Sequence, residues 1–307
     1  MPGELILVTG GAGFIGSHLC RRVLDRGYQV RVLDNLSFGR KEWVPDEAEL
    51  VVGDIRDIED CRAACDGVSG VFHAAAMSRA GPSVDAIDIC TQQNVTGTQN
   101  VLIAARDARV RRFVYSGSST YYGNRPTPHR ETTPPDFLNF YALSKAVGEE
   151  YAFMFDRIFG LPVVVLRYFN VYGPRQPEVG AYALVLGIFL RRWADGEELE
   201  IHGSGEQRRD FVHVRDVADA NIAAFESDVR SEVFNIGSGT NVSVKELADM
   251  ISPRQHLAPR RAGDAEVTLA DISKATDLLR WHPKVSFEEG VGEMIDLSRE
   301  ERHGHAD

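Results

Sequence analysis

Two side chains near the middle of the chain have the types and the spacing of an acid–base pair. Tyr141 and Lys145 lie four residues apart at the start of a segment with helical periodicity, so both project from one helix face. A phenol ordinarily titrates at about pH 10, but a nearby ammonium favours the phenolate and lowers that pKa. Tyr141 is therefore a candidate general base for removing an alcohol proton while hydride leaves the same carbon, with Lys145 as its partner.

A run of hydroxyl side chains precedes this helix. Ser116-Gly117-Ser118-Ser119-Thr120 follows a short apolar segment that is typical of a buried strand. Ligands bind at the carboxyl ends of parallel strands, so a hydroxyl here can hold the reacting oxygen and share its proton.

The first apolar segment ends in glycines at positions 10, 13 and 16, and a helical segment follows at once. This spacing lets the backbone turn sharply, approach a pyrophosphate and present the helix N-terminus to it. Asp34 ends the second strand, where a carboxylate accepts both ribose hydroxyls and repels a 2′-phosphate, so the sequence favours NAD over NADP. Asp54-Ile55 follows the third strand and is expected to border the adenine.

The elements that must position these residues alternate along the first half of the chain. Strands are predicted at 5–9, 29–33, 49–52, 70–73, 113–116 and 162–167, and helices at 14–26, 57–65, 84–106 and 141–159. This order predicts a Rossmann-type doubly wound parallel sheet. We expect an NAD-binding domain over residues 1–174, with segments near 205–240 returning to it, and a smaller α/β substrate lobe over 175–307.

In that second half, helices are predicted at 181–194, 214–225 and 273–280 and from Phe287 onward. Strands are predicted at 198–201 and 232–236, and a short strand at 266–269. Ser243 and Glu246 form the pattern of a capping box that opens a helix to Met250.

Composition excludes several other classes of protein. The net charge of −11 argues against a nucleic-acid binder, and no apolar run is long enough to span a bilayer. Four scattered cysteines form neither a CxxC pair nor a zinc pattern, so no metal site is expected. The N-terminus has no secretory signal pattern, and we expect a cytoplasmic protein.

Many motifs in one order make the chain resemble the extended short-chain dehydrogenase/reductase family, and within it the bacterial UDP-glucose/UDP-N-acetylglucosamine 4-epimerases. The motifs are the glycine loop 9–16, Gly53–Asp57, His73–Ala76, Asn94–Thr98, Ser116–Gly123, Tyr141–Lys145, Leu166–Pro174, Arg209–Ala218, Asn235–Gly239, Arg261–Asp264 and Ala270–Ala275.

The resemblance implies roles for individual residues. It assigns the catalytic roles to Ser118, Tyr141 and Lys145. It implies an NAD site that includes Tyr141 and Lys145 together with Gly10, Gly13, Phe14, Ile15, Gly16, Asp34, Asn35, Asp54, Ile55, Ala74, Ala76 and Tyr168. It implies a nucleotide-sugar site that includes Ser118 and Tyr141 together with Ser78, Ser119, Asn170, Leu199, His202, Arg209, Arg261, Asp264 and Thr268. The two arginines are expected to bind the diphosphate, and the small side chain at Thr268 to leave room for an N-acetyl group.

The expected reaction is 4-epimerisation of a UDP-sugar through a 4-keto intermediate. Related dehydratases carry an Asp-Glu pair after the strand hydroxyl and sugar-acid decarboxylases a Glu, whereas Ser119 and Thr120 stand there in this chain. The alternatives are a 4,6-dehydratase, a reductase, an epimerase at another carbon, or an inactive nucleotide-sensing module. By resemblance, the helical segments 94–106 and 141–159 are expected to pair in a four-helix homodimer interface.

Overall fold

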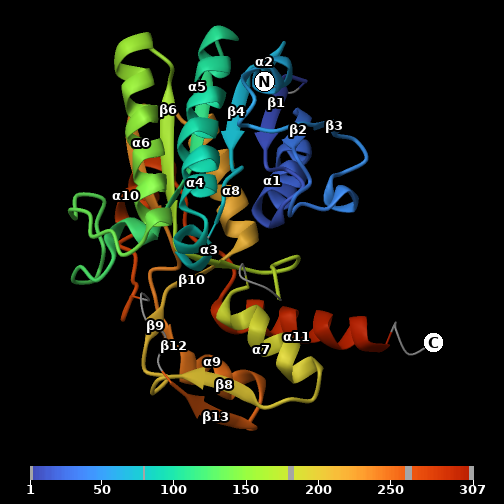
Figure 1. The fold of residues 1–307 in the computed structure, drawn as a ribbon, viewed down its shortest axis with the longest axis vertical. Coiled ribbons are helices and arrows are strands. Elements are labelled where there is room, and N and C mark those ends of the chain that lie inside the picture. Colours follow the sequence, from blue (N-terminus) through green and yellow to red (C-terminus); the bar gives the residue numbers. More distant parts are fainter. Residues whose placement is uncertain (1–2, 79, 179–182, 260–264, 304–307) are drawn as a thin grey trace.

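The computed structural model describes residues 3–78, 80–178, 183–259 and 265–303. Its centre is a parallel sheet of seven strands (Figure 1). In spatial order they are β11 (Glu232–Ile236), β6 (Val163–Tyr168), β5 (Arg112–Ser118), β4 (Gly70–His73), β1 (Leu5–Thr9), β2 (Gln29–Asp34) and β3 (Glu49–Val52). The order reverses between β1 and β4, as in a doubly wound fold, so the predicted fold class is confirmed.

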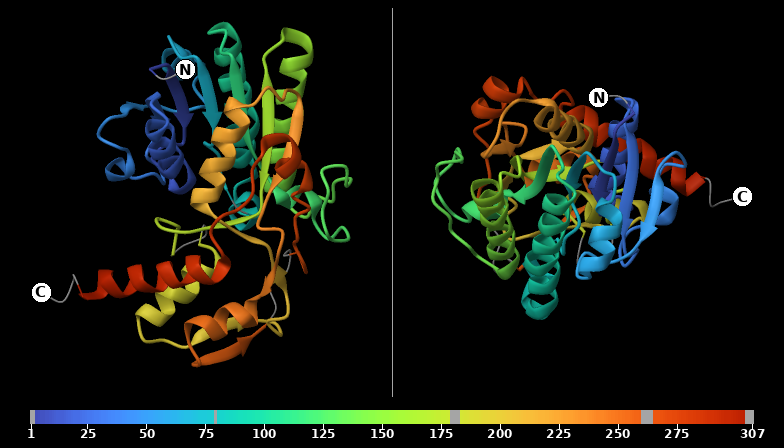
Figure 2. Two further views of the ribbon diagram at one scale, coloured as in Figure 1. Left: turned by 180° about the vertical axis from the view of Figure 1, so that it is seen from behind. Right: turned by 90° about the horizontal axis from the view of Figure 1, so that it is seen from above.

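Helices cover both faces of this sheet, which explains why its central strands are mostly apolar. On one face lie α1 (Phe14–Asp25), α8 (Val214–Glu226) and α10 (Ser273–Leu279), seen from behind in Figure 2. On the other lie α2 (Ile58–Cys65), α5 (Thr98–Asp107) and α6 (Phe140–Phe159). At the edge of the sheet β11 pairs with β6, while α8 packs on one face.

A second group of elements lies beyond the carboxyl ends of the strands (Figure 1). It has its own apolar core, which includes Leu190, Leu199 and Leu247. Its helices are α7 (Val185–Ala194), α9 (Val244–Ile251) and α11 (Phe287–His303), and its strands are β8 (Leu199–His202), β9 (Arg208–Arg209), β12 (Val242–Ser243) and β13 (Gln255–Ala258). The strands β7 (Asn170–Tyr172) and β10 (Phe211–His213) pair in parallel between the sheet and this group. The capping box of Ser243 and Glu246 at the start of α9 is confirmed.

The structure corrects two predicted elements. The single helix over 84–106 is wrong, since the chain forms α3 (Ala80–Asp85), α4 (Ile87–Thr91), a π-helical turn η2 (Gln92–Gly97) and α5. The strand over 266–269 is also wrong, because only Val267 there forms an isolated bridge, to Arg208. Two short 3₁₀ turns complete the fold, η1 (Lys41–Trp43) and η3 (Ser119–Tyr122).

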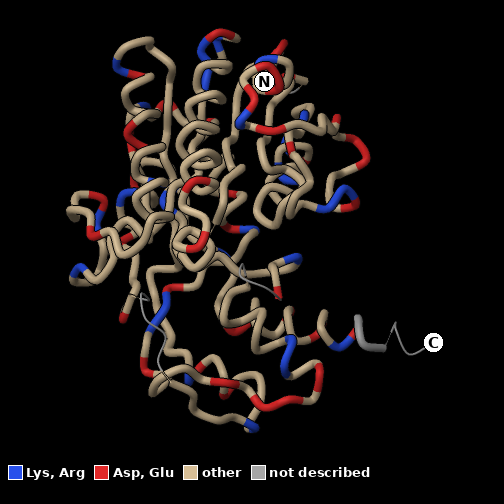
Figure 3. The backbone as a smooth tube through the Cα atoms, viewed as in Figure 1, with Lys and Arg blue, Asp and Glu red and all other residues tan. Residues whose placement is uncertain are grey.

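Acidic and basic residues are mixed over both parts of the molecule (Figure 3). The negative net charge is therefore spread over the molecule. Within the described residues, no helix has the length and the apolar character needed to cross a membrane.

Candidate active site

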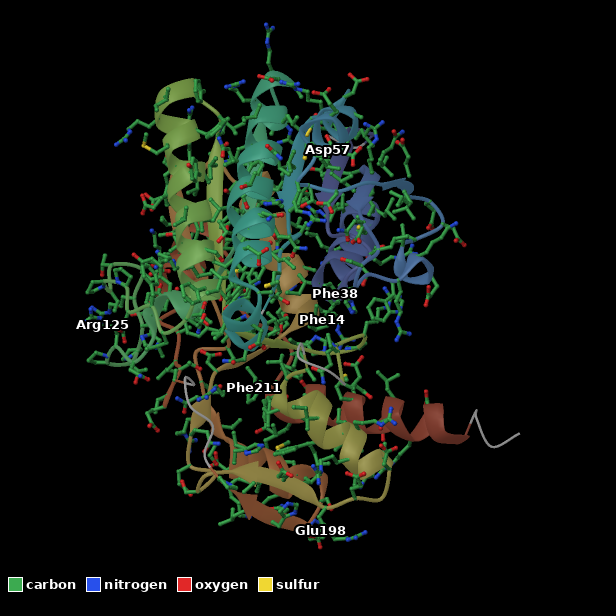
Figure 4. The ribbon with its side chains drawn as sticks, viewed as in Figure 1. Phe14, Phe38, Asp57, Arg125, Glu198 and Phe211 are labelled. Carbon is green, nitrogen blue, oxygen red and sulfur yellow. The ribbon has the colours of Figure 1, made fainter. Side chains whose placement is uncertain are left out.

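A cavity of about 1420 Å³ separates the carboxyl ends of the sheet strands from the second group of elements. Phe14 and Phe38 line it from the side of the sheet, and Phe211 lines it from the opposite side (Figure 4). A ligand in this cavity therefore contacts both parts of the protein, at the position expected for a doubly wound sheet.

The glycine loop at one end of the cavity requires its glycines. A Cβ on Gly16 would lie 2.0 Å from the carbonyl oxygen of Gly10, and Gly10 itself has a φ of +71°. Gly13 precedes the first turn of α1 and makes no side-chain cap, so the backbone N–H groups of that turn face the cavity end. This cradle fits the pyrophosphate of a dinucleotide.

Asp34 lies at the carboxyl end of β2 and is almost fully buried. Its carboxylate accepts hydrogen bonds from the backbone N–H groups of Ala12, at 3.0 Å, and Leu36, at 2.9 Å. These bonds hold both oxygens at the edge of the cavity, next to the glycine loop. The position agrees with a carboxylate that accepts ribose hydroxyls.

Asn35 and Asp54 border the same end of the cavity, and the Asn35 amide donates to the Asp54 carboxylate at 2.9 Å. The Arg56 guanidinium bonded to Asp54 lowers the pKa of that carboxyl to about 2. Asp54 is therefore ionised at neutral pH. The remaining residues predicted to contact NAD also line the cavity, apart from Lys145; they are Gly10, Gly13, Phe14, Ile15, Gly16, Ile55, Ala74, Ala76, Tyr141 and Tyr168.

Hydrogen bonds at the start of α6 fix the position of Tyr141. The Asn139 side chain caps the helix by accepting from the Ala142 N–H at 2.9 Å. The Tyr141 N–H donates to the Ser83 hydroxyl at 3.0 Å. Tyr141 lines the cavity together with Ser118, whose hydroxyl pairs with that of Thr120 at 2.9 Å. The predicted base and the predicted hydroxyl thus share one cavity.

Lys145 lies one turn behind Tyr141 and is buried below the cavity wall. Its ammonium sits 4.2 Å from the centroid of the Tyr115 ring. Burial lowers the pKa of Lys145 to about 7, and the Glu149 carboxylate opposes that shift. Nearby His73 stays neutral, because burial first and Lys145 second lower its pKa to about 3.

The π-helical turn η2 contains a residue that sequence reasoning assigned to no role. Asn94 is fully buried, and its amide bonds both the N–H and the carbonyl of Met77, at 2.8 and 2.9 Å. The same amide donates to the Ser144 hydroxyl at 2.9 Å. Asn94 therefore ties α6 to the segment between the cavity residues Ala76 and Ser78. In the sequence, the place of Asn94 in the Asn94–Thr98 motif was the feature that could have indicated this role.

At the other end of the cavity, Asn170 and Thr268 are joined. The Asn170 amide donates to the Thr268 hydroxyl at 3.1 Å, and that hydroxyl also accepts from the Asp210 N–H at 3.1 Å. Arg209 lines the same region and donates to the carbonyls of Arg208 and Glu266. Ser78, Ser119 and His202 also line the cavity, as predicted for the substrate site.

The structure does not bring Leu199 to the cavity. Leu199 and Ile201 are fully buried in the second core, whereas Glu200 and His202 line the cavity. Side chains alternate along a strand, so Leu199 and His202, three positions apart on β8, face opposite ways. From the sequence, the same alternation could have predicted that Glu200 lines the cavity beside His202. Its carboxylate lies 3.1 Å from Nε2 of His202.

Arg261 and Asp264 lie outside the described residues, so their roles stay predictions. Among the described residues, no cluster of three His, Cys, Asp or Glu side chains is suited to hold a metal ion.

Comparison with known proteins adds findings of three kinds: a family model, two relatives and a solved structure. The model of the NAD dependent epimerase/dehydratase family matches residues 6–237. A putative UDP-glucose 4-epimerase of Methanocaldococcus jannaschii is 38% identical over 301 residues, which cover 95% of this chain and 97% of that protein. A UDP-N-acetyl-alpha-D-glucosaminuronate decarboxylase of Bacillus cytotoxicus is 30% identical over 315 residues, which cover 96% of this chain and 97% of that protein.

The third finding is a likeness to a solved structure, that of UDP-N-acetylglucosamine 4-epimerase from Methanobrevibacter ruminantium in complex with UDP-N-acetylmuramic acid. It is 33% identical and superposes with a TM-score of 0.93, covering 98% of this chain and all of that chain.

Proposed function

The chain belongs to the NAD dependent epimerase/dehydratase family, and from this premise we propose that it is a UDP-sugar 4-epimerase. The observation that carries the proposal is the meeting of three features at one cavity: the glycine cradle, the Ser118 hydroxyl, and Tyr141 with Lys145 behind it. Together they provide a dinucleotide site beside an alcohol-oxidising pair.

In this proposal, Tyr141 removes the proton from the C4 hydroxyl of the sugar while Ser118 holds that oxygen. The glycine cradle and Asp34 would hold NAD, which would supply the acceptor and donor of hydride for C4. The buried ammonium of Lys145 stabilises the Tyr141 phenolate. The 4-keto sugar then turns within the cavity, and Tyr141 returns its proton when hydride is restored on the opposite face.

Epimerisation is favoured over elimination of water by the turn that follows Ser118. This turn, η3, has the residues Ser119, Thr120, Tyr121 and Tyr122, so it carries no carboxylate to serve as an extra acid and base. A dehydratase, a reductase, an epimerase at another carbon and a nucleotide-sensing module are the alternatives. The sensing module is disfavoured, because Tyr141 and Ser118 both reach the cavity.

For the substrate, we propose a UDP-hexose, with UDP-N-acetylhexosamines also accepted. The support is the short side chain of Thr268 at the cavity wall and the likeness to a relative named for UDP-N-acetylglucosamine. Arg209 is proposed to bind the diphosphate, because a guanidinium offers paired donors to phosphate oxygens. We also propose that residues 1–174, with the returning segments near 205–240, bind NAD, and that residues 175–307 mainly bind the substrate.

We further propose a homodimer formed through α5 and α6. On α6, the apolar side chains Phe140, Leu143, Met154 and Ile158 are exposed at helical spacing. Exposed apolar stripes of this kind mark surfaces that another protein covers. The stripe runs along the outer side of α6, away from the sheet, as a four-helix interface requires.

The test is turnover of a panel of UDP-, dTDP- and GDP-hexoses, with products separated by anion exchange and identified by their anomeric proton signals. A 4-epimerase converts UDP-galactose to UDP-glucose with no net change in redox state. Loss of water would indicate a dehydratase, and consumption of a nicotinamide a reductase. If no member of the panel is converted while NAD is bound, the enzymatic proposal fails.

A further inference from the structure

Behind the proposed catalytic pair lies a buried ion pair that the reaction itself does not use. The Arg167 guanidinium, on β6, donates to both oxygens of the Glu149 carboxylate, on α6, at 3.0 and 2.5 Å. Both side chains are almost fully buried, with exposed fractions of 3% and 5%. Bidentate contact between a guanidinium and a carboxylate is among the strongest charge-assisted interactions in proteins.

The pair joins four elements around the site. The Arg167 guanidinium also donates to the Tyr122 hydroxyl at 2.8 Å, and that hydroxyl donates to the Asn235 amide oxygen at 2.6 Å. The face of the guanidinium lies 3.5 Å from the centroid of the Tyr121 ring. Tyr121 and Tyr122 belong to η3, the turn that directly follows Ser118.

Glu149 also lies one helical turn after Lys145, on the same face of α6. The groups that interact with the Lys145 ammonium are Glu149 on α6, the Tyr115 ring on β5, His73 on β4 and Cys90 on α4. Among these described groups, Glu149 is the carboxylate and supplies the negative charge near the ammonium. Without that charge, the buried Lys145 ammonium would lose its proton at a lower pH.

We propose that Glu149, held in a bidentate ion pair by Arg167, is a positioning residue whose negative charge keeps Lys145 protonated and thereby makes Tyr141 a base. The proposal rests on the proposed function, in which Lys145 stabilises the Tyr141 phenolate. Under this proposal the buried ion pair contributes to the chemistry. An ion pair that only stabilised the fold would not.

Three variants separate these two roles. Glu149→Gln removes the negative charge and leaves the Arg167 cation, so Lys145 deprotonates at lower pH. Arg167→Met leaves the buried Glu149 carboxylate without its cation and weakens the negative charge beside Lys145, so Lys145 again deprotonates at lower pH. Arg167→Lys keeps the charge and loses only the paired geometry, so it serves as the matched control.

The first readout is the alkaline limb of the kcat–pH profile. Activity needs protonated Lys145 and falls as the pH rises through the pKa of Lys145. We expect the limb to move to lower pH by about one pH unit in Glu149→Gln, and in the same direction in Arg167→Met. In Arg167→Lys it should stay within a few tenths of the wild-type value.

The second readout is the titration of Lys145 itself, followed by NMR on protein labelled at the lysine side chains. The chain has only five lysines, Lys41, Lys145, Lys245, Lys274 and Lys284, so the buried one can be assigned by its loss in Lys145→Met. Thermal melts verify that each variant is folded at the temperature of the titration.

A shift of the Lys145 titration to lower pH in Glu149→Gln and Arg167→Met, with Arg167→Lys unchanged, supports the proposal, since lost packing alone would affect Arg167→Lys as well. An equal shift in Arg167→Lys, or an unchanged Lys145 titration in folded Glu149→Gln, overturns it. If the wild-type protein converts no sugar nucleotide, the proposed function fails. The NMR titration still decides whether Glu149 controls the charge of Lys145.

Discussion

Thr268 provides a test in which stability and sugar recognition are linked by one hydroxyl group. The residue is almost fully buried at the cavity wall, and its hydroxyl accepts from the Asn170 amide and from the Asp210 N–H. Thr268→Val preserves the size and branching of the side chain but removes this acceptor. The change therefore isolates the hydrogen bonds.

The expected cost follows from the donors left behind. The Asp210 N–H has the Thr268 hydroxyl as its acceptor, and a buried donor left unsatisfied costs about 1–3 kcal/mol. The Asn170 amide keeps its bond to the Asp210 carbonyl, at 3.0 Å, so its loss is about 1 kcal/mol. Together, Thr268→Val should lower the free energy of unfolding by about 2–4 kcal/mol.

Thr268→Ser is the matched control, because it keeps the hydroxyl and loses one methyl group. Its cost should be about 1 kcal/mol. We expect the stability order Thr, Ser, Val, measured as urea midpoints with all samples saturated in NAD, since unequal cofactor binding would change the order. The Val variant should also raise KM for the sugar nucleotide, because Asn170 is less firmly oriented. A Val variant as stable as the Ser variant would refute the assigned hydrogen bonds.

Four further predictions concern the cofactor, the general base, the α6 surface and the size of the sugar. NAD should co-purify, because a redox-neutral enzyme gains nothing by releasing it; mass analysis of denatured protein tests this, and a preference for added NADP would contradict the role of Asp34. Tyr141→Phe should keep the fold and nucleotide binding but lose turnover by about 10²–10⁴-fold, as expected for loss of a general base, and near-normal turnover would exclude that role. Ile158→Glu should convert the dimer to a monomer, visible by light scattering, and a wild-type protein that is monomeric would remove the α6 interface. Thr268→Tyr should suppress UDP-N-acetylhexosamines more than plain hexoses, at a cost of about 1–3 kcal/mol, and equal loss on both would contradict a size limit at this position.

The helices and strands that follow from local pattern were predicted well. The core strands from β1 to β6 and the start of α6 within one residue of Tyr141 agree with the structure. So does the capping box at Ser243, because its two hydrogen bonds join residues three apart. Such features depend on neighbours in the chain, which the sequence lists directly.

The predicted helix over 84–106 failed for the opposite reason. Its apolar periodicity continues through η2, but the Asn94 amide bonds Met77 and Ser144, 17 and 50 residues away. Those bonds favour a π turn over a regular helix at this point. Because these bonds join residues that are distant in the sequence, a local sequence pattern does not predict them.

The sequence by itself determined the cofactor cradle, because the glycine spacing, the following helix and Asp34 all act within one βαβ unit. It also determined that Tyr141 and Lys145 share a helix face. Only the tertiary structure decided that Lys145 is buried against Tyr115, that Glu149 is paired with Arg167, and that the Thr268 hydroxyl orients Asn170. These contacts join different strands, helices and loops, and a side chain's burial and charge depend on what packs against it once the fold has brought those elements together.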